Sequence, residues 1–182
     1  MKKLFLMAAF VVASVAASAQ VYVGGGIGFQ SSKADTDGAK AATSFSITPE
    51  IGYHLDDNWA VGIGLGYSHA KSSSEVKTDA FTIEPYARYT FAKWNNVGLF
   101  VDGVVGYTNK TVKEDGEDDV KTNTFNIGLR PGLSISLNDK LNFVTTVGFL
   151  GYKNTDYDAY KVNSYGFDFD LSNINFALYY NF

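Results

Sequence analysis

The stretch Thr122–Leu137 alternates between apolar and polar positions from Phe125 onward. From Phe125 onward the odd positions, apart from Pro131, are bulky and apolar: Phe125, Ile127, Leu129, Leu133, Ile135 and Leu137. The even positions are Asn126, Gly128, Arg130, Gly132, Ser134 and Ser136. Because successive side chains of a strand point to opposite faces, this pattern predicts a strand with one apolar and one polar face. The stretch is also long enough to supply the roughly 9–11 residues with which a tilted strand crosses a bilayer.

Seven further stretches repeat the alternation: Val21–Gln30, Thr43–Tyr53, Trp59–His69, Ala80–Phe91, Val97–Thr108, Leu141–Tyr152 and Ser172–Phe182. An even number of strands with this two-residue period is typical of an outer-membrane barrel. After residue 19 no run approaches the roughly 18 apolar residues of a membrane-spanning helix. The sequence therefore predicts an all-β fold, a closed antiparallel up-and-down eight-stranded transmembrane β-barrel.

The predicted connections alternate in length along the chain. Short turns are expected at His54–Asn58, Ala92–Asn96 and Asn138–Lys140. Longer polar loops are expected at Ser31–Ala42, Ala70–Asp79, Asn109–Lys121 and Lys153–Leu171. Short periplasmic turns and long outer loops are the habit of such barrels, so both chain termini are expected at the periplasmic end. The alternation in Tyr165–Asp170 suggests that the last strand extends beyond the membrane.

Five charged residues fall within the predicted strands, all opposite the bulky apolar face: Glu50, Glu84, Arg88, Asp102 and Arg130. A lipid-facing Arg or Lys at the bilayer midplane costs roughly 2–4 kcal/mol, so the charged face is predicted to line the barrel interior. There the acidic residues are expected to pair with the two arginines, since an unpaired buried charge is costly. We interpret this network as a structural plug, with a gate or a narrow ion path as the alternative.

Other large side chains on the inward face support the plug, and they are expected to pack against the small inner face of Trp59–His69. These side chains are Tyr22, Tyr86, Phe100, Leu150 and Tyr152.

Aromatic residues gather at both ends of the predicted strands. Those near the short turns are Tyr53, Trp59, Phe91, Trp94, Tyr180 and Phe182. Those near the long loops are Phe29, Phe45, Tyr67, Phe81, Tyr107, Phe125 and Phe149. Two aromatic girdles at the two membrane interfaces are expected for a membrane barrel.

All three prolines, Pro49, Pro85 and Pro131, fall inside predicted strands. A closed barrel has no free edge, and proline removes a donor from the ladder. Each proline is therefore expected to mark a bulge or a local gap.

Residues 1–19 are predicted to be a cleaved signal peptide, and residues 20–182 to be the barrel domain. Lys2 and Lys3 form a positive start, Leu4–Ala16 is apolar, and Ala17–Ala19 fits the small-residue cleavage pattern. Cleavage makes the formal charge more negative than −4. That balance argues against nucleic acid as a partner, because a nucleic-acid binder is expected to be basic. The chain contains no cysteine, so neither a lipid-modified cysteine nor a disulfide is expected.

Three groups of residues suggest chemistry only weakly. Gly24–Gly28 lacks the spacing of a phosphate loop and suits an inner barrel wall or a kink. The acidic residues of the third long loop could attract divalent cations, but their spacing is not that of an EF-hand, and a solvated charge run is the favoured interpretation: Glu114, Asp115, Glu117, Asp118 and Asp119.

The histidines are the remaining candidates. His69 stands beside Ser68 at the outer rim, where a lipid A-modifying enzyme could hold a site, but the two side chains point to opposite faces and no G-x-S-x-G elbow is present. His54 lies in a periplasmic turn. No catalytic, cofactor-binding or metal-binding residue is predicted, and no cofactor is expected.

The whole stretch Val21–Phe182 resembles the small eight-stranded outer-membrane barrels typified by OmpX and the OmpA transmembrane domain, within the outer membrane protein beta-barrel family. The closest correspondence is the C-terminal pattern Phe176-Ala-Leu178-Tyr-Tyr180-Asn-Phe182. It is similar to the signal that these proteins present to the barrel-assembly machinery.

The resemblance implies a non-enzymatic protein of the bacterial outer membrane, in contact with lipid and lipopolysaccharide. The barrel would anchor four surface loops that serve adhesion, binding of a host or cell-surface ligand, or envelope integrity. Two alternatives remain: a small porin-like channel and, less favoured, a lipid A-modifying enzyme.

Overall fold

The computed structural model describes residues 20–32, 40–74, 76–114, 116, 118–157, 160–169 and 174–182. The expected signal peptide and parts of the long loops lie outside these residues. The described residues form ten strands. No helix among them is long and apolar enough to cross a membrane. The strands are β1 (Val21–Ser32), β2 (Ala42–His54), β3 (Trp59–Lys71), β4 (Lys77–Trp94), β5 (Val97–Lys113), β6 (Val120–Ser136), β7 (Leu141–Val147), β8 (Phe149–Asp156), β9 (Lys161–Asp168) and β10 (Ile174–Asn181).

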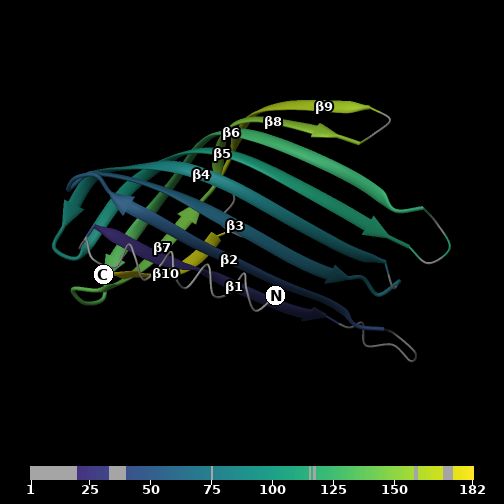
Figure 1. The fold of residues 1–182 in the computed structure, drawn as a ribbon, viewed down its shortest axis with the longest axis horizontal. Coiled ribbons are helices and arrows are strands. Elements are labelled where there is room, and N and C mark those ends of the chain that lie inside the picture. Colours follow the sequence, from purple (N-terminus) through teal and green to yellow (C-terminus); the bar gives the residue numbers. More distant parts are fainter. Residues whose placement is uncertain are drawn as a thin grey trace, which may run out of the picture.

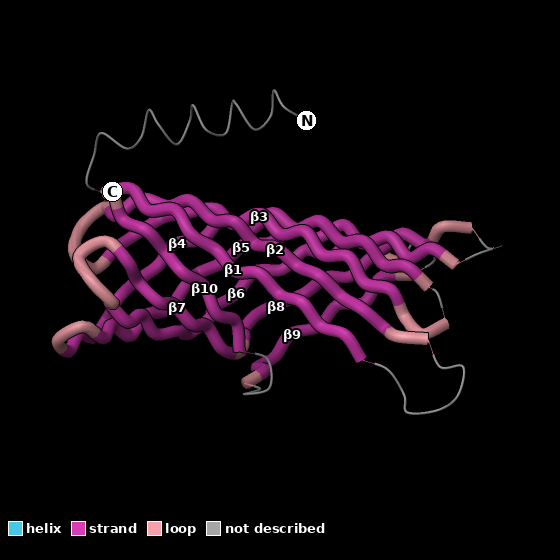
Figure 2. Tube along the Cα trace, turned by 90° about the horizontal axis from the view of Figure 1, so that it is seen from below, coloured by secondary structure: helices cyan, strands magenta, loops and turns pink. Residues whose placement is uncertain are grey.

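The strands close into an antiparallel barrel, as predicted. Neighbours in the ring follow the order β1 to β7 and then β10, which pairs with β1 (Figures 1 and 2). The closing register runs from Tyr22 opposite Asn181 to Gly25 opposite Leu178. The amide of Phe182 donates to the carbonyl of Val21 at 3.1 Å, so the two ends of the barrel chain meet at the short-turn end.

The register places the bulky odd positions side by side on the outer surface. Ile51 lies opposite Ile63, and Tyr67 lies opposite Phe81. Aromatic residues are exposed at both ends of this surface, as the girdles require: Phe29, Phe45, Tyr53, Trp59, Tyr67, Phe81, Phe91, Trp94, Tyr107, Phe125 and Tyr180. A soluble barrel would bury such residues, so this surface is suited to lipid.

Several strands are longer than the sequence pattern predicted. β4, β5 and β6 extend into the expected loops, because cross-strand pairing continues as far as Val112 opposite Val120. At the other end β4 reaches Trp94, which leaves only Asn95 and Asn96 for the turn expected at Ala92–Asn96. Asn95 has a φ of 48°, a left-handed conformation that asparagine tolerates in tight turns.

The seventh predicted strand, Leu141–Tyr152, is interrupted at Gly148, which has a φ of 74°. β6 pairs with β7 at Leu133 opposite Thr145, but with β8 at Leu129 opposite Leu150. The extra residue reverses the inward and outward positions, because side chains of a strand alternate faces.

The reversal corrects three sequence-based assignments. Leu150 and Tyr152 were expected inside, but they lie on the face of Leu129 and Ile127. Phe149 was expected in the outer girdle, but it packs partly buried against the interior cluster.

The predicted loop Lys153–Leu171 is also partly wrong, because it contains the end of β8 and all of β9. The alternating residues from Tyr165 belong to β9, which pairs with β8 rather than continuing β10 directly. Between the pairs Val147–Ile174 and Phe149–Asp168 the ascending chain passes only Gly148, whereas the descending chain passes residues 169–173. Because the two chains pass different numbers of residues between these pairs, the ladder of the β8–β9 hairpin is not continuous with that of the β7–β10 pair.

All three prolines mark gaps in the ladder, which confirms the expectation. Pro49 falls between the β2–β3 pairs made by Ile47 and Glu50, and Pro85 between the β4–β5 pairs made by Ile83 and Tyr86. Pro131 lies where β6 changes its partner from β8 to β7. A missing N–H is tolerated at these points because no ladder bond is made there.

Candidate functional site

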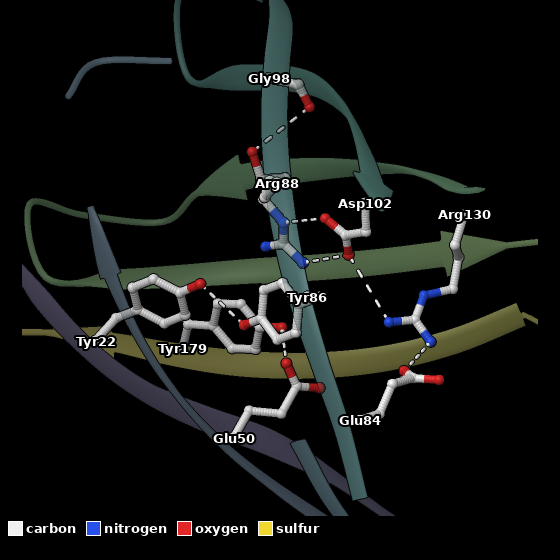
Figure 3. Close-up of polar contacts among 10 residues, drawn as sticks. Tyr22, Glu50, Glu84, Tyr86, Arg88, Gly98, Asp102, Arg130 and Tyr179 are labelled. Carbon is white, nitrogen blue, oxygen red and sulfur yellow. Dashed lines mark hydrogen bonds and ion pairs between the residues drawn. The ribbon is translucent and has the colours of Figure 1, made fainter. Parts of the chain in front are cut away.

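The five charged strand residues all project into the barrel and meet at mid-height (Figure 3). Glu50 comes from β2, Glu84 and Arg88 from β4, Asp102 from β5 and Arg130 from β6. They share the even positions of their strands, opposite the apolar odd positions. Strand alternation alone therefore carries the charges into the interior.

Arg88 and Asp102 form the most buried ion pair of this cluster. They are Cα partners across β4 and β5, and Nε of Arg88 lies 2.7 Å from Oδ1 of Asp102 while Nη2 lies 2.9 Å from Oδ2. The Asp102 side chain is 0% exposed. The guanidinium also lies 3.8 Å from the centroid of the Phe100 ring. The bidentate ion pair and the contact of the guanidinium with the aromatic ring stabilise both charges in a place where water does not solvate them.

Arg130 and Glu84 form a second pair just beside the first. Nη1 of Arg130 lies 2.7 Å from Oε1 of Glu84, and Nη2 lies 3.8 Å from Oδ2 of Asp102. Arg130 thus links the two acidic residues of β4 and β5. The expected pairing of Glu84 and Asp102 with the two arginines is confirmed.

Glu50 departs from the expectation, because it accepts a hydrogen bond from the Tyr179 hydroxyl at 2.6 Å instead of pairing with an arginine. The register explains this contact, since Gly24 of β1 lies opposite both Glu50 and Tyr179. A Cβ on Gly24 would lie 2.8 Å from Cγ of Tyr179, so glycine is needed there for the ring to cross β1. Sequence analysis missed Tyr179, although its alternation with Leu178 and Tyr180 indicates an inward position.

Aromatic side chains fill the half of the interior that is nearer the short turns, which is the end expected to face the periplasm. Tyr22, Tyr86 and Phe100 are buried there, as predicted, and the hydroxyls of Tyr22 and Tyr86 are 2.8 Å apart. Tyr86 lies over Gly62 of β3, since a Cβ on Gly62 would be 2.6 Å from Cζ of Tyr86. The small inner face of β3 therefore receives a large ring, as the sequence suggested. Val104 and Val144 are also buried in this cluster, and sequence analysis did not identify these two residues.

The outer half of the interior is hollow. A cavity of about 520 Å³ lies above the charges, and Glu50, Glu84 and Arg130 are among its lining residues. Its walls include glycine and small hydroxyl residues, among them Ser46, Thr48, Gly66, Ser68 and Thr82. The interior therefore combines a filled half near the short turns with a chamber in the half near the long loops, where charged residues lie among the lining.

The remaining candidates from the sequence do not converge on one site. Nδ1 of His69 lies 2.8 Å from Oδ1 of Asp79, and the Tyr67 hydroxyl donates to the same oxygen at 3.0 Å. Ser68 lines the cavity on the opposite side of β3. The barrel wall thus separates His69 from Ser68. His54 ends β2 at the periplasmic end, where its ring lies 4.9 Å from that of Tyr22.

The other two motifs are also placed. Gly24–Gly28 lies within β1, part of the barrel wall as expected, and Gly25 has a positive φ of 143°. Asp115 and Glu117 of the acidic run lie outside the described residues. Among the residues that are described, no group of three or more His, Cys, Asp or Glu side chains could hold a metal ion.

Comparison with known proteins agrees with this geometry. A family model described as the outer membrane protein beta-barrel domain matches residues 4–182. No match was found among curated proteins.

Two solved structures share the fold at low sequence identity. The crystal structure of Neisserial surface protein A (NspA) is similar with a TM-score of 0.54 and 15% identity, over 91% of this chain and 98% of that chain. The N-terminal β-barrel domain of Pseudomonas aeruginosa OprF is similar with a TM-score of 0.52 and 14% identity, over 91% of this chain and 98% of that chain. The family match covers nearly the whole chain, and the chain belongs to the outer membrane protein beta-barrel domain family of the bacterial outer membrane.

Proposed function

We propose that this protein is a non-enzymatic outer-membrane anchor that presents its outer strand ends and four loops to molecules at the cell surface. The observation that supports this proposal best is the filled periplasmic half of the barrel. Tyr22, Phe100 and Asp102 are almost fully buried there. A barrel filled in this way offers rigidity rather than a passage, and loops on a rigid scaffold commonly carry binding functions.

Long strands raise the surface loops above the membrane. β4, β5 and β6 each exceed the roughly 9–11 residues needed to cross the bilayer, so their outer ends stand above the hydrocarbon region. We expect ligands of the cell surface or of a host to contact these ends and the loops they carry.

Trimming the loops tests the proposal. Shortening all four loops, at residues 33–39, 72–76, 114–119 and 157–160, should abolish adhesion of whole cells, while heat-modifiability on a gel shows that the barrel still folds. A variant with substitutions at Leu55 and Asp57, in a periplasmic turn, is the matched control and should adhere normally. Adhesion that survives the trimming would contradict the proposal.

The porin-like alternative makes the opposite prediction in a planar bilayer. The filled interior should give no single-channel conductance, whereas a general porin measured in parallel should conduct. Reproducible conductance steps would favour the channel and would require the aromatic cluster to move. The lipid A-modifying alternative predicts an altered lipid A profile on deletion of the protein, and an unchanged profile would remove it.

A contribution to envelope integrity is supported by a row of lysines at the outer rim. Lys71 lies opposite Lys77, and Lys77 lies opposite Lys113, on the same outer face as the aromatic residues Tyr67 and Phe81. Like charges placed directly opposite one another are destabilising. Lys113 lies 3.7 Å from Asp119, and phosphate groups of lipopolysaccharide at this level would further reduce the repulsion along the row.

Charge reversal tests this second role. The double variant Lys77→Glu and Lys113→Glu should make cells more sensitive to detergent and chelator. Lys140→Glu, at the opposite membrane interface, is the control and should not. Equal sensitivity of the two variants would exclude a specific role for the lysine row.

Two further expectations concern biogenesis. We expect residues 1–19 to be removed on export, which N-terminal sequencing of the mature protein checks. We also expect Phe182 to form part of the signal for the barrel-assembly machinery, so that its deletion lowers the amount of folded protein in the outer membrane.

A further inference from the structure

The barrel wall has a lateral seam between β1 and the β8–β9 hairpin. The β1–β10 ladder ends at Gly25 opposite Leu178, and within the described residues no strand pairs with Gly26–Ser32 on the side away from β2. β9 likewise pairs with β8 alone. Figure 1 shows the hairpin lying apart from β1. Among the described residues, therefore, no ladder joins β1 to β9 in this half of the wall.

The edges of the seam carry apolar side chains at unusually high exposure. Ile27 and Phe29 of β1 are 82% and 77% exposed, and Tyr165 and Phe167 of β9 are 88% and 69% exposed. These residues occupy the outward positions of their strands, on the surface assigned to lipid. The seam is thus bordered by groups that acyl chains can contact, in the outer half of the membrane.

The cavity reaches the β1 and β10 side of this seam from the inside. Gly26 and Ile27 of β1 and Ile174 and Phe176 of β10 line the same cavity as the charged residues. Its volume of about 520 Å³ is within the range of roughly 300–1,000 Å³ that is usual for small-ligand pockets. A molecule with a polar head and an apolar chain could place each part in a matching environment.

The charges at the cavity floor select the kind of head group. Arg88 and Asp102 neutralise each other, and Arg130 is paired with Glu84. Glu50 is left with the neutral Tyr179 hydroxyl as its hydrogen-bond partner among the described side chains. A carboxylate at the floor of a chamber is stabilised by a cation that also donates hydrogen bonds, which a primary ammonium group does.

We propose that the outer half of the barrel binds the head group of an amine-bearing outer-leaflet lipid, which enters sideways through the seam while its acyl chain remains between β1 and β9. The ammonium group pairs with Glu50, and the hydroxyls of Ser46, Thr48 and Thr82 surround the rest of the head group. This site is separate from the surface loops, and its failure would leave the proposed anchor function intact.

Native mass spectrometry of the folded protein in detergent tests the site with three lysolipids of equal chain length. Lysophosphatidylethanolamine should be retained at least ten-fold better than lysophosphatidylcholine, whose nitrogen cannot donate hydrogen bonds, or lysophosphatidylglycerol. Free O-phosphoethanolamine, which lacks the chain, should bind at least ten-fold more weakly than the lysolipid. Equal retention of the three lysolipids would overturn the head-group assignment, and tight binding of the chain-free compound would overturn lateral entry.

Two variants locate the binding. Glu50→Gln removes the charge. Gly64→Val fills the space beside Glu50, because a Cβ on Gly64 would lie 3.5 Å from Cγ of Glu50 and 3.7 Å from the Glu84 carbonyl oxygen. Both should abolish the preference for lysophosphatidylethanolamine. Gly103→Val, on the outer face of β5, where a Cβ would meet only the Ala87 carbonyl at 3.8 Å, is the matched control and should retain it. A preference that survives both interior variants would overturn the proposal.

Discussion

The guanidinium of Arg88 and the carboxylate of Asp102 meet in two parallel hydrogen bonds of 2.7 and 2.9 Å inside the filled half of the barrel. Each residue is the direct cross-strand partner of the other, so the ladder between β4 and β5 sets their approach. Both side chains are buried. Removing either one would leave the other as an unpaired buried charge, which costs much folding free energy.

Removing one member of this pair should therefore be strongly destabilising. Asp102→Ala leaves the Arg88 charge buried and unpaired, and we expect it to lower the free energy of unfolding by about 3–5 kcal/mol. The double variant Arg88→Met, Asp102→Leu removes both charges and should lose much less. Urea unfolding in lipid vesicles, followed by tryptophan fluorescence, measures both. A loss below about 1 kcal/mol for Asp102→Ala would mean that water reaches the pair.

Gly62 and Gly64 of β3 provide a test of the aromatic filling. A Cβ on Gly62 would lie 2.6 Å from the Tyr86 ring and 2.9 Å from the Ile51 carbonyl, whereas a Cβ on Gly64 would make only ordinary contacts from 3.5 Å. Gly62→Ala should therefore cost about 1–3 kcal/mol of stability, as overpacked interiors do. Gly64→Ala should be close to neutral. Similar losses for the two variants in the same urea assay would contradict the packing described for Tyr86.

The break at Gly148 should be visible in chemical labelling. Leu150→Cys places a thiol on the lipid-facing side of β8, while Phe149→Cys places one inside. The chain has no native cysteine, so a membrane-soluble maleimide would report these positions alone. We expect Leu150→Cys to react and Phe149→Cys to be protected. The reverse pattern would show that the seventh strand continues without a change of face.

The periplasmic turn at Asp56 should make stability depend on acid. The backbone N–H groups of Asn58 and Trp59 donate to Oδ1 of Asp56 at 2.7 and 2.8 Å, and these bonds hold the pKa of Asp56 below its usual value. A carboxyl whose pKa is lowered by folding stabilises the protein above its unfolded pKa, and this contribution disappears as the pH falls through the folded pKa. Asp56→Asn should therefore flatten the loss of stability between about pH 5 and about pH 2.

Asn138 offers the matched comparison for that turn. Its side-chain oxygen accepts the backbone N–H groups of Lys140 and Leu141 at 2.9 Å each, the same arrangement without a titratable group. Asn138→Asp should add acid sensitivity where Asp56→Asn removes it. The measurement is the urea midpoint of each variant across this pH range. If the pH dependence of the midpoint is unchanged in both variants, the turns do not contribute to the acid sensitivity of the protein.

Much of the architecture follows from the sequence alone because the two-residue period of a strand is local. The odd positions from Phe125 to Leu137 and their counterparts elsewhere define the lipid-facing surface without any knowledge of strand partners. The same alternation carries Arg88, Asp102 and Arg130 inward, and opposite charges confined to one narrow interior must pair. The gaps at Pro49, Pro85 and Pro131 follow as well, since a residue without an N–H cannot complete a ladder.

The tertiary structure decided what depends on register between distant strands. Glu50 contacts Tyr179 because Gly24 lies opposite both, a relation that spans the closing pair of strands and leaves no local trace. Leu150 faces outward because one extra residue at Gly148 reverses the alternation, and only the pairing with β6 reveals it. The seam likewise arises because one residue separates β7 from β8, whereas five residues separate β9 from β10. Side-chain periodicity is a property of one strand, whereas closure, partner choice and the open edge are properties of how the strands meet.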